Sequence, residues 1–293
     1  LLPVLTMMRR STVQACAILG VAAALSAAWL RIASRPGLQA DFAEYNEAAN
    51  RIRIERYLSR PSAPSHVVVG SSLSGRLLPA YFSQTRLGDV GNLGLDGSGP
   101  SVGIEVILRR KDLPETVWVE TYLMGQGQTG NDRALLEGLD SIGTRLAVAC
   151  PLFRASLRPS SVAYSALKRR REVAGSGPTW TTNTAAAVPG APVNAAPVDP
   201  GVEDRWRAVL RELARRNVRV VFMDMPSGET TRPGPRREPD LADRLQAEFR
   251  LGRVDLREAW FSRGWVPRYT DGRHLDAGSA MATASMLAKA AAR

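Results

Sequence analysis

Two short motifs at opposite ends of the chain carry side chains that could act together as a nucleophile and its base. Near the start, Ser72 closes the segment VVVGSS at 67–72, where an apolar run meets a glycine. Near the end, Asp271 precedes His274 by three residues. An aspartate at that spacing can orient an imidazole, and the imidazole can then take a proton from a serine. The two motifs together therefore indicate acyl-ester chemistry at Ser72.

Each motif also has a simpler interpretation when it is taken alone. Ser72 is expected to precede a helix, where serine is a common capping residue and free N–H groups favour negative charge. His274 could be an ordinary residue at a helix start. The other histidine, His66, opens the first apolar run and should lie at the opposite end of a sheet. The hypothesis depends on the pair, because a doubly wound sheet can bring both loops to one edge.

The elements that must position these motifs follow an alternating pattern. Five short apolar runs are predicted to be strands, at 66–70, 88–93, 116–121, 218–223 and 253–256. Most of them are continuous, which is typical of parallel strands covered on both faces. Helical patterns occur at 98–110, 202–217 and 275–293, and Asn217 is expected to end the second of these. The pattern predicts a three-layer α/β fold with a flavodoxin-like parallel sheet over residues 37–293.

The first 36 residues are predicted to be a membrane anchor. Residues 12–30 form an uncharged, mostly apolar run of 19 residues, close to the roughly 20 that a spanning helix needs. A cleaved signal peptide is the alternative, because Ser26-Ala27-Ala28 supplies small residues, although signal sequences have shorter apolar regions. Arg9 and Arg10 favour a cytoplasmic N-terminus, and Arg31 weakens that preference. We expect a single-pass protein of the bacterial inner membrane with a periplasmic domain.

Composition narrows the classes of function. The chain has 293 residues, a net charge of +11, 44% hydrophobic and 23% charged residues, which excludes wholesale disorder and a polytopic membrane protein. Two cysteines and two histidines exclude a disulfide scaffold and a His-rich metal site, so we expect no metal and no cofactor. The positive charge suits an anionic membrane surface or an acidic polymer. No nucleic-acid-binding motif occurs, so nucleic acid is not an expected partner.

Two further segments interrupt the α/β pattern. Residues 175–201 are rich in Gly, Pro, Ala, Thr and Asn and show no periodicity, which favours a disordered insertion, with a lid over the site as the alternative. The cluster Lys168-Arg169-Arg170-Arg171 precedes this insertion. It is either a solvated helix end or a contact for lipid phosphates or an acidic glycan.

The motifs together resemble the SGNH hydrolase superfamily, the GDSL-like esterases. Gly70-Ser71-Ser72 resembles the first block, with Ser71 in place of the usual aspartate, as in membrane-anchored cell-envelope relatives. The segment NLGLDG at 92–97 resembles the second block, in which Gly94 matches the glycine of the oxyanion hole. Asp271 and His274 match the last block, and the resemblance covers about residues 66–290.

This resemblance implies a serine esterase or an O-acyltransferase, with O-acetyl transfer favoured, acting on an envelope polysaccharide or glycolipid. It also implies a membrane-bound O-acyltransferase as a partner and an oxyanion hole built from the N–H groups of Ser72 and Gly94. The family often adds an asparagine in its third block, which is missing here. Asn131 is the candidate replacement, with Thr121, Gln126 and Gln128 as alternatives. Because the usual aspartate of the first block is replaced and the asparagine is missing, a catalytically inactive accessory or binding protein with the same fold is the competing hypothesis.

Overall fold

The computed structural model describes residues 2–33, 35, 40, 43–175, 200–227, 240–271 and 273–291. The predicted insertion at 175–201 therefore lies almost wholly outside the described residues. In chain order the elements are α1 (Leu2–Ala33), α2 (Asn46–Leu58), β1 (His66–Gly70), η1 (Ser74–Arg76), η2 (Pro79–Tyr81), β2 (Val90–Gly94), α3 (Pro100–Leu108), β3 (Thr116–Glu120), α4 (Gly130–Gly138), α5 (Ile142–Ala149), η3 (Pro151–Phe153), η4 (Ala155–Leu157), α6 (Pro159–Gly175), α7 (Pro200–Arg215), β4 (Arg219–Asp224), α8 (Leu241–Phe249), β5 (Gly252–Asp255), α9 (Leu256–Phe261) and α10 (Ala277–Ala291), where η denotes a short 3-10 helix.

The five strands form one parallel sheet in the order β2-β1-β3-β4-β5. This is the order of flavodoxin-like doubly wound sheets, and it confirms the predicted α/β class with a parallel sheet. The chain leaves β1 toward one side and β3 toward the other, so the switch point lies between these two strands. Open α/β sheets bind ligands at the carboxyl ends of the strands beside such a point. The segments that follow β1 and β3 therefore occupy the position where a site is expected.

Each predicted strand agrees with an observed one to within two residues at either end. The largest difference is at the start of β2, where Gly88 has φ +59° and Asp89 is exposed, so pairing begins only at Val90. The helix predicted at 202–217 is α7, and Asn217 takes the left-handed φ of 58° that ends it. The sequence did not predict α2, α4, α5, α6, α8 or α9.

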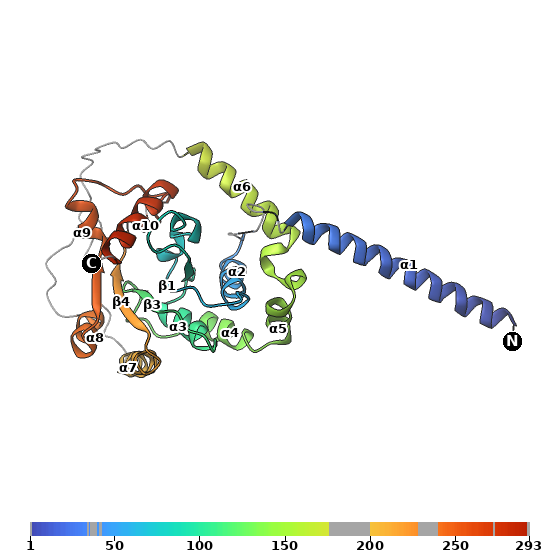
Figure 1. The fold of residues 1–293 in the computed structure, drawn as a ribbon, viewed down its shortest axis with the longest axis horizontal. Helices are drawn as coiled ribbons and strands as arrows, with labels where there is room; N and C mark the ends of the chain where they lie inside the picture. Colours follow the sequence, from blue (N-terminus) through green and yellow to red (C-terminus); the bar gives the residue numbers. More distant parts are fainter. Residues whose placement is uncertain are drawn as a thin grey trace.

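The sheet is covered on both faces, which explains its uninterrupted apolar strands. Val67 and Val69 of β1 belong to a core cluster with residues of α2, α3, α4, α7 and α8, whereas Val68 belongs to a cluster with residues around η1 and η2 and of α9 and α10. Figure 1 shows the strands between these two groups of helices. The resulting three layers match the predicted architecture.

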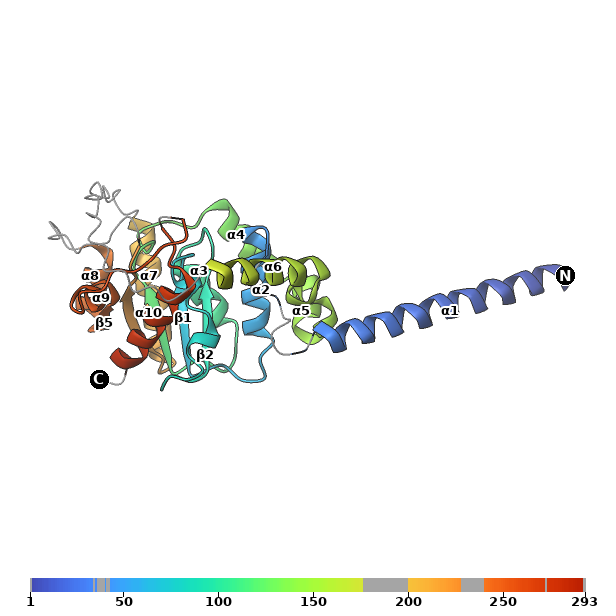
Figure 2. The same cartoon turned by 90° about the horizontal axis from the view of Figure 1, so that it is seen from above.

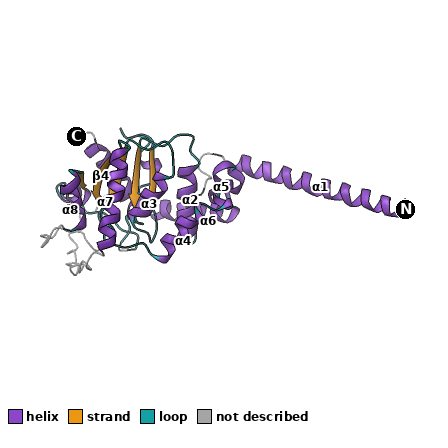
Figure 3. Ribbon diagram, turned by 90° about the horizontal axis from the view of Figure 1, so that it is seen from below, coloured by secondary structure: helices purple, strands orange, loops and turns teal. Residues whose placement is uncertain are grey.

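Helix α1 extends away from this body as a single long helix (Figures 1 and 2). Its segment Thr12–Ile32 is 21 residues long, is not buried, and is apolar enough to cross a membrane. The last turns of α1 meet the body, where the indole Nε1 of Trp29 donates a hydrogen bond of 2.7 Å to the carbonyl of Leu157 in η4. Helices α5 and α6 lie at the end of the body nearest α1 (Figure 3).

Candidate active site

Ser72 lies in the turn that follows β1, at the carboxyl edge of the sheet. The expected helix does not form there, because the chain makes only the 3-10 turn η1 and then η2. The capping interpretation of Ser72 also fails, since no side chain caps η1. Instead the Ser72 hydroxyl is half-buried and lies 2.8 Å from the Nε2 atom of His274.

The turn is held in place by Glu120, a fully buried residue at the end of β3. Its carboxylate accepts hydrogen bonds from the N–H of Ser71 at 3.0 Å, the hydroxyl of Ser71 at 2.6 Å and the N–H of Ser74 at 3.0 Å. Gly70 makes this possible, because a Cβ atom there would lie 2.4 Å from the Glu120 Oε2 atom. The residues on either side of Ser72 are thus fixed by a carboxylate from the neighbouring strand.

Asp271 and His274 lie in a loop that returns to the sheet before α10. One Asp271 oxygen accepts the backbone N–H groups of Arg273 at 3.1 Å and His274 at 2.8 Å. The loop is closed by an antiparallel bridge between Tyr269 and Leu275, and Leu275 is buried in the core. The three-residue spacing therefore lets one carboxylate oxygen bind the loop backbone while the other faces the imidazole.

The side chains of Ser72, His274 and Asp271 form a continuous chain of hydrogen bonds. The Asp271 Oδ2 atom lies 2.7 Å from His274 Nδ1, and Nε2 of the same ring faces Ser72. Partial burial acts to raise the pKa of the Asp271 carboxyl, but hydrogen bonds from His274 and Arg273 outweigh it and hold this pKa well below its usual value. An ionised carboxylate can only accept, so Nδ1 carries the ring proton and Nε2 is left to accept from the Ser72 hydroxyl.

Ser72 and His274 open into one cavity of about 190 Å³. Its walls come from the turn after β1, the turn after β2, α2 with the residues before it, and α6. Most of the lining side chains are polar or charged, with three cations from Arg53, Arg76 and Lys168 and two carboxylates from Glu44 and Asp96. The remaining lining residues are Ala43, Asn46, Ala49, Gly97 and Tyr164. A polar substrate group that reached Ser72 would therefore pass charged and hydroxyl-bearing side chains.

In the turn after β2, Asp96 and Gly97 line this cavity, whereas the predicted Gly94 does not. The Gly94 N–H donates to the Asn92 side chain at 2.7 Å, and Gly94 does not line the cavity. The N–H groups of Leu95, Asp96 and Ser98 also have partners within the fold. Among the described residues the N–H of Gly97 has no partner, and Gly97 lines the cavity with a left-handed φ of +74°. The N–H group of Gly94 is therefore already hydrogen-bonded within the fold, whereas that of Gly97 is not.

Helix α2 holds this turn in position. The Asn50 side chain accepts from the Asp96 N–H at 2.7 Å and donates to the Asp96 carbonyl at 3.0 Å. Arg53 donates to the Gly94 carbonyl and binds the Asp96 carboxylate at 3.0 Å. Asn46, in the first turn of the same helix, lines the cavity beside Gly97. The part of the cavity wall formed by the turn after β2 is therefore held by α2, a helix that the sequence did not predict.

Asn131 is not brought to Ser72. It is exposed in the first turn of α4 and lines a separate cavity between α2, α4 and α5. Thr121 donates to the Asp224 carboxylate, and Gln128 donates to Glu105, so both side chains are engaged elsewhere.

Among the described residues no group of three or more His, Cys, Asp or Glu side chains could hold a metal ion.

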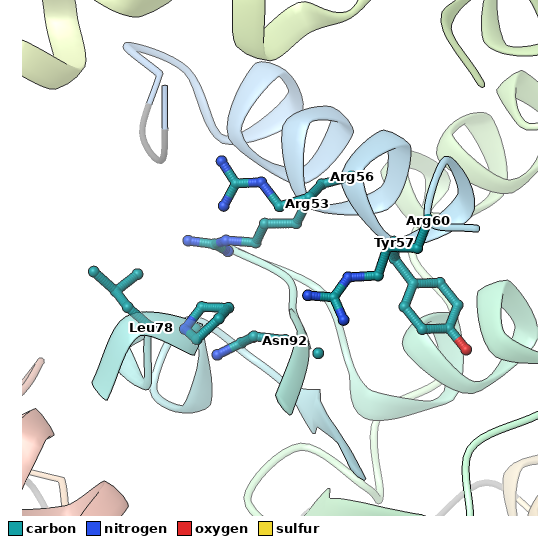
Figure 4. A pocket seen from close by; sticks show the side chains of 9 residues that line it. Arg53, Arg56, Tyr57, Arg60, Leu78 and Asn92 are labelled. Carbon is teal, nitrogen blue, oxygen red and sulfur yellow. The ribbon is translucent and has the colours of Figure 1, made fainter. Parts of the chain in front are cut away.

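A third cavity lies between α2 and the segment that contains η1 and η2 (Figure 4). The side chains of Arg53, Arg56 and Arg60 lie on one side of it, and Leu78 and Asn92 on the other (Figure 4). The three guanidinium groups have partners in the protein: Arg53 as above, Arg56 with the Ala40 carbonyl and Arg60 with Asp89. The cavity of about 20 Å³ has room for one water molecule and no substrate.

Sequence reasoning missed Glu120, Gly97 and Asn46. Glu120 had one signal, since a glutamate that ends a continuous apolar strand needs buried donors. Gly97 and Asn46 had no such signal, because their role depends on which backbone groups the fold leaves unpaired.

A scan against models of protein families found no match, and a search of curated proteins found no significantly similar sequence.

Proposed function

We propose that this chain is a serine-dependent acyl-ester hydrolase or O-acyltransferase of the SGNH type. The observation that carries the proposal is the 2.8 Å contact between the Ser72 hydroxyl and a His274 ring whose other nitrogen binds Asp271. This distance lies within the range of about 2.6–3.2 Å over which a base can take a proton.

In the proposed reaction Ser72 Oγ attacks an ester carbonyl while His274 Nε2 takes its proton. Asp271 keeps the ring in the required tautomer and stabilises the imidazolium that forms. The tetrahedral oxyanion is held by the N–H groups of Ser72 and Gly97, and Asn46 is the third donor in reach of the same cavity. His274 then returns the proton to the leaving alcohol, and the acyl group passes to water or to a sugar hydroxyl.

The walls of the cavity favour a hydroxyl-rich substrate over a lipid chain, because they are polar and carry three cations and two carboxylates. With α1 as an anchor in the bacterial inner membrane, the substrate is an envelope polysaccharide or glycolipid on the periplasmic side. A membrane-bound O-acyltransferase is the proposed acyl donor, with acetyl as the favoured group.

The test uses the full chain in detergent with p-nitrophenyl acetate as substrate. Ser72→Ala and His274→Ala should fall to the background rate, whereas Ser83→Ala, at an exposed serine, should keep the wild-type rate. Asn46→Ala should lose about 10²–10³-fold if its amide donates to the oxyanion. Equal turnover by wild type, Ser72→Ala and His274→Ala would overturn the proposal.

Labelling with a fluorophosphonate separates the enzyme from the non-catalytic alternative. The probe should modify Ser72 in the wild type and leave His274→Ala unmodified, with the site located by mass spectrometry. A folded wild type that is neither labelled nor active would instead favour the accessory or binding protein.

A further inference from the structure

An unusual concentration of exposed apolar side chains lies on α5 and η3. Among the described residues outside α1, nine large apolar side chains are exposed, and four of them lie between residues 142 and 153. Ile142 is 76% exposed and Leu146 is 42% exposed, and their spacing of four places them on one face of α5. Leu152 and Phe153 in η3 are 40% and 49% exposed. Such a concentration of exposed apolar groups within twelve residues is typical of a surface that contacts a protein partner or a membrane.

This surface lies where the membrane helix joins the body. Helix α1 packs against η3, and Trp29 binds the Leu157 carbonyl directly after it. Trp29 is near the end of the apolar segment Thr12–Ile32, and tryptophan is enriched at the level of lipid headgroups. Figures 1 and 2 both show α5 at the end of the body that faces α1. If α1 crosses a bilayer, α5 and η3 therefore lie at its surface.

The charge of the same stretch is one-sided. Residues 141–158, which contain α5, η3 and η4, include three arginines and no Asp or Glu, within a chain whose net charge is +11. Arg145, in α5, and Arg158, directly after η4, are both exposed. Apolar groups at the acyl boundary with arginines at the headgroups are the combination that anionic lipid surfaces bind.

We propose that α5 and η3 form a docking surface that inserts its apolar side chains into the headgroup region of an anionic bilayer beside α1. The domain is then held at the membrane by the docking surface as well as by α1. Helix α6 follows η4 directly and carries Tyr164 and Lys168, so docking also fixes the orientation of the cavity that contains Ser72. The inference rests on α1 crossing a membrane and is independent of the reaction at Ser72.

The two native cysteines provide a matched test in the full chain. Cys150 lies between α5 and η3 and is partly exposed, whereas Cys16 is exposed on α1. Each is labelled separately with a nitrobenzoxadiazole fluorophore, in the Cys16→Ser and Cys150→Ser variants. The proteins are reconstituted in vesicles of phosphatidylcholine and phosphatidylglycerol that carry nitroxide-labelled lipids. A third label at Ser262→Cys, without either native cysteine, reports on the exposed end of α9.

We expect the nitroxide lipids to remove most of the fluorescence at Cys16 and at Cys150 and to leave the label at position 262 unchanged. Adding Ile142→Asp and Phe153→Asp should restore the fluorescence at Cys150 without changing that at Cys16. Quenching at Cys16 without quenching at Cys150 would overturn the docking surface and leave the anchor standing, including the case in which another protein covers the patch. Absence of quenching at both positions would overturn the anchor and the docking surface together.

Discussion

The two halves of the proposed site are held in different ways. Ser72 lies in a turn whose neighbours are buried and bound to Glu120, a residue of another strand. His274 lies in a loop held mainly by hydrogen bonds within a few residues, and half of the Asp271 side chain is exposed. The first half therefore depends on the core of the protein, and the second depends on its own short sequence. Changes in the two halves should separate activity from stability.

The largest expected effect is on activity alone. Asp271→Asn keeps the shape of the side chain but cannot hold the Nδ1 proton, so turnover should fall about 10⁴-fold, as in serine triads generally. The melting temperature should stay close to that of the wild type, because the side chain lies at the surface. Turnover of p-nitrophenyl acetate and thermal unfolding of the full chain check both parts. A large loss of stability in this variant would contradict the local character of the loop.

In the other half, activity and stability should fall together. Glu120→Ala removes the acceptor of three buried hydrogen bonds, and the stranded donors cost about 3 kcal/mol or more of unfolding free energy. Glu115→Ala, at an exposed position before the same strand, is the control and should change stability by less than about 0.5 kcal/mol. Chemical denaturation measures the stability of both variants, and turnover of p-nitrophenyl acetate measures their activity. Full stability in Glu120→Ala would show that the turn does not depend on the core.

A smaller effect is expected from a single methyl group. Gly70→Ala places a Cβ atom against Glu120 and the Ser74 hydroxyl, and should cost about 1–3 kcal/mol. Gly138→Ala, in α4, meets no atom within 4 Å and should be neutral or stabilise the protein by up to about 1 kcal/mol. If both variants melted at the wild-type temperature, the packing of Glu120 over Gly70 would not be tight.

The smallest effect concerns pH. The pKa of Asp271 is lower in the folded protein than in the unfolded chain, so its ionised form favours folding above the ordinary carboxyl range. This contribution is lost as pH falls through the folded pKa. Because half of the side chain is exposed, it amounts to a few tenths of a kcal/mol. The stability difference between wild type and Asp271→Asn, measured in urea, should shrink below about pH 4; a difference that grows in acid would reverse the assigned sign.

The same contrast explains which parts of the fold and of the site could be predicted from the sequence. The strands and the Asp271 to His274 spacing could be predicted because buried runs and short motifs are local patterns. Glu120 acts across the sheet, and the choice between Gly94 and Gly97 depends on which N–H groups the fold has already paired. The apolar residues of α5 raise a related difficulty, because their pattern does not distinguish a core face from an exposed one. Long-range hydrogen bonds and the exposure of a helix face are properties of the fold, and local sequence patterns do not determine them.

The hydrogen bond from Trp29 to η4 has one further consequence. Helix α6 continues from η4 and supplies part of the wall of the cavity that contains Ser72, so α1 and the cavity are connected through η4 and α6. Spanning helices adjust their tilt when bilayer thickness changes. If α1 spans a membrane, a tilt of α1 would therefore be transmitted to α6, and the positions of Tyr164 and Lys168 in the cavity wall would depend on the surrounding lipids.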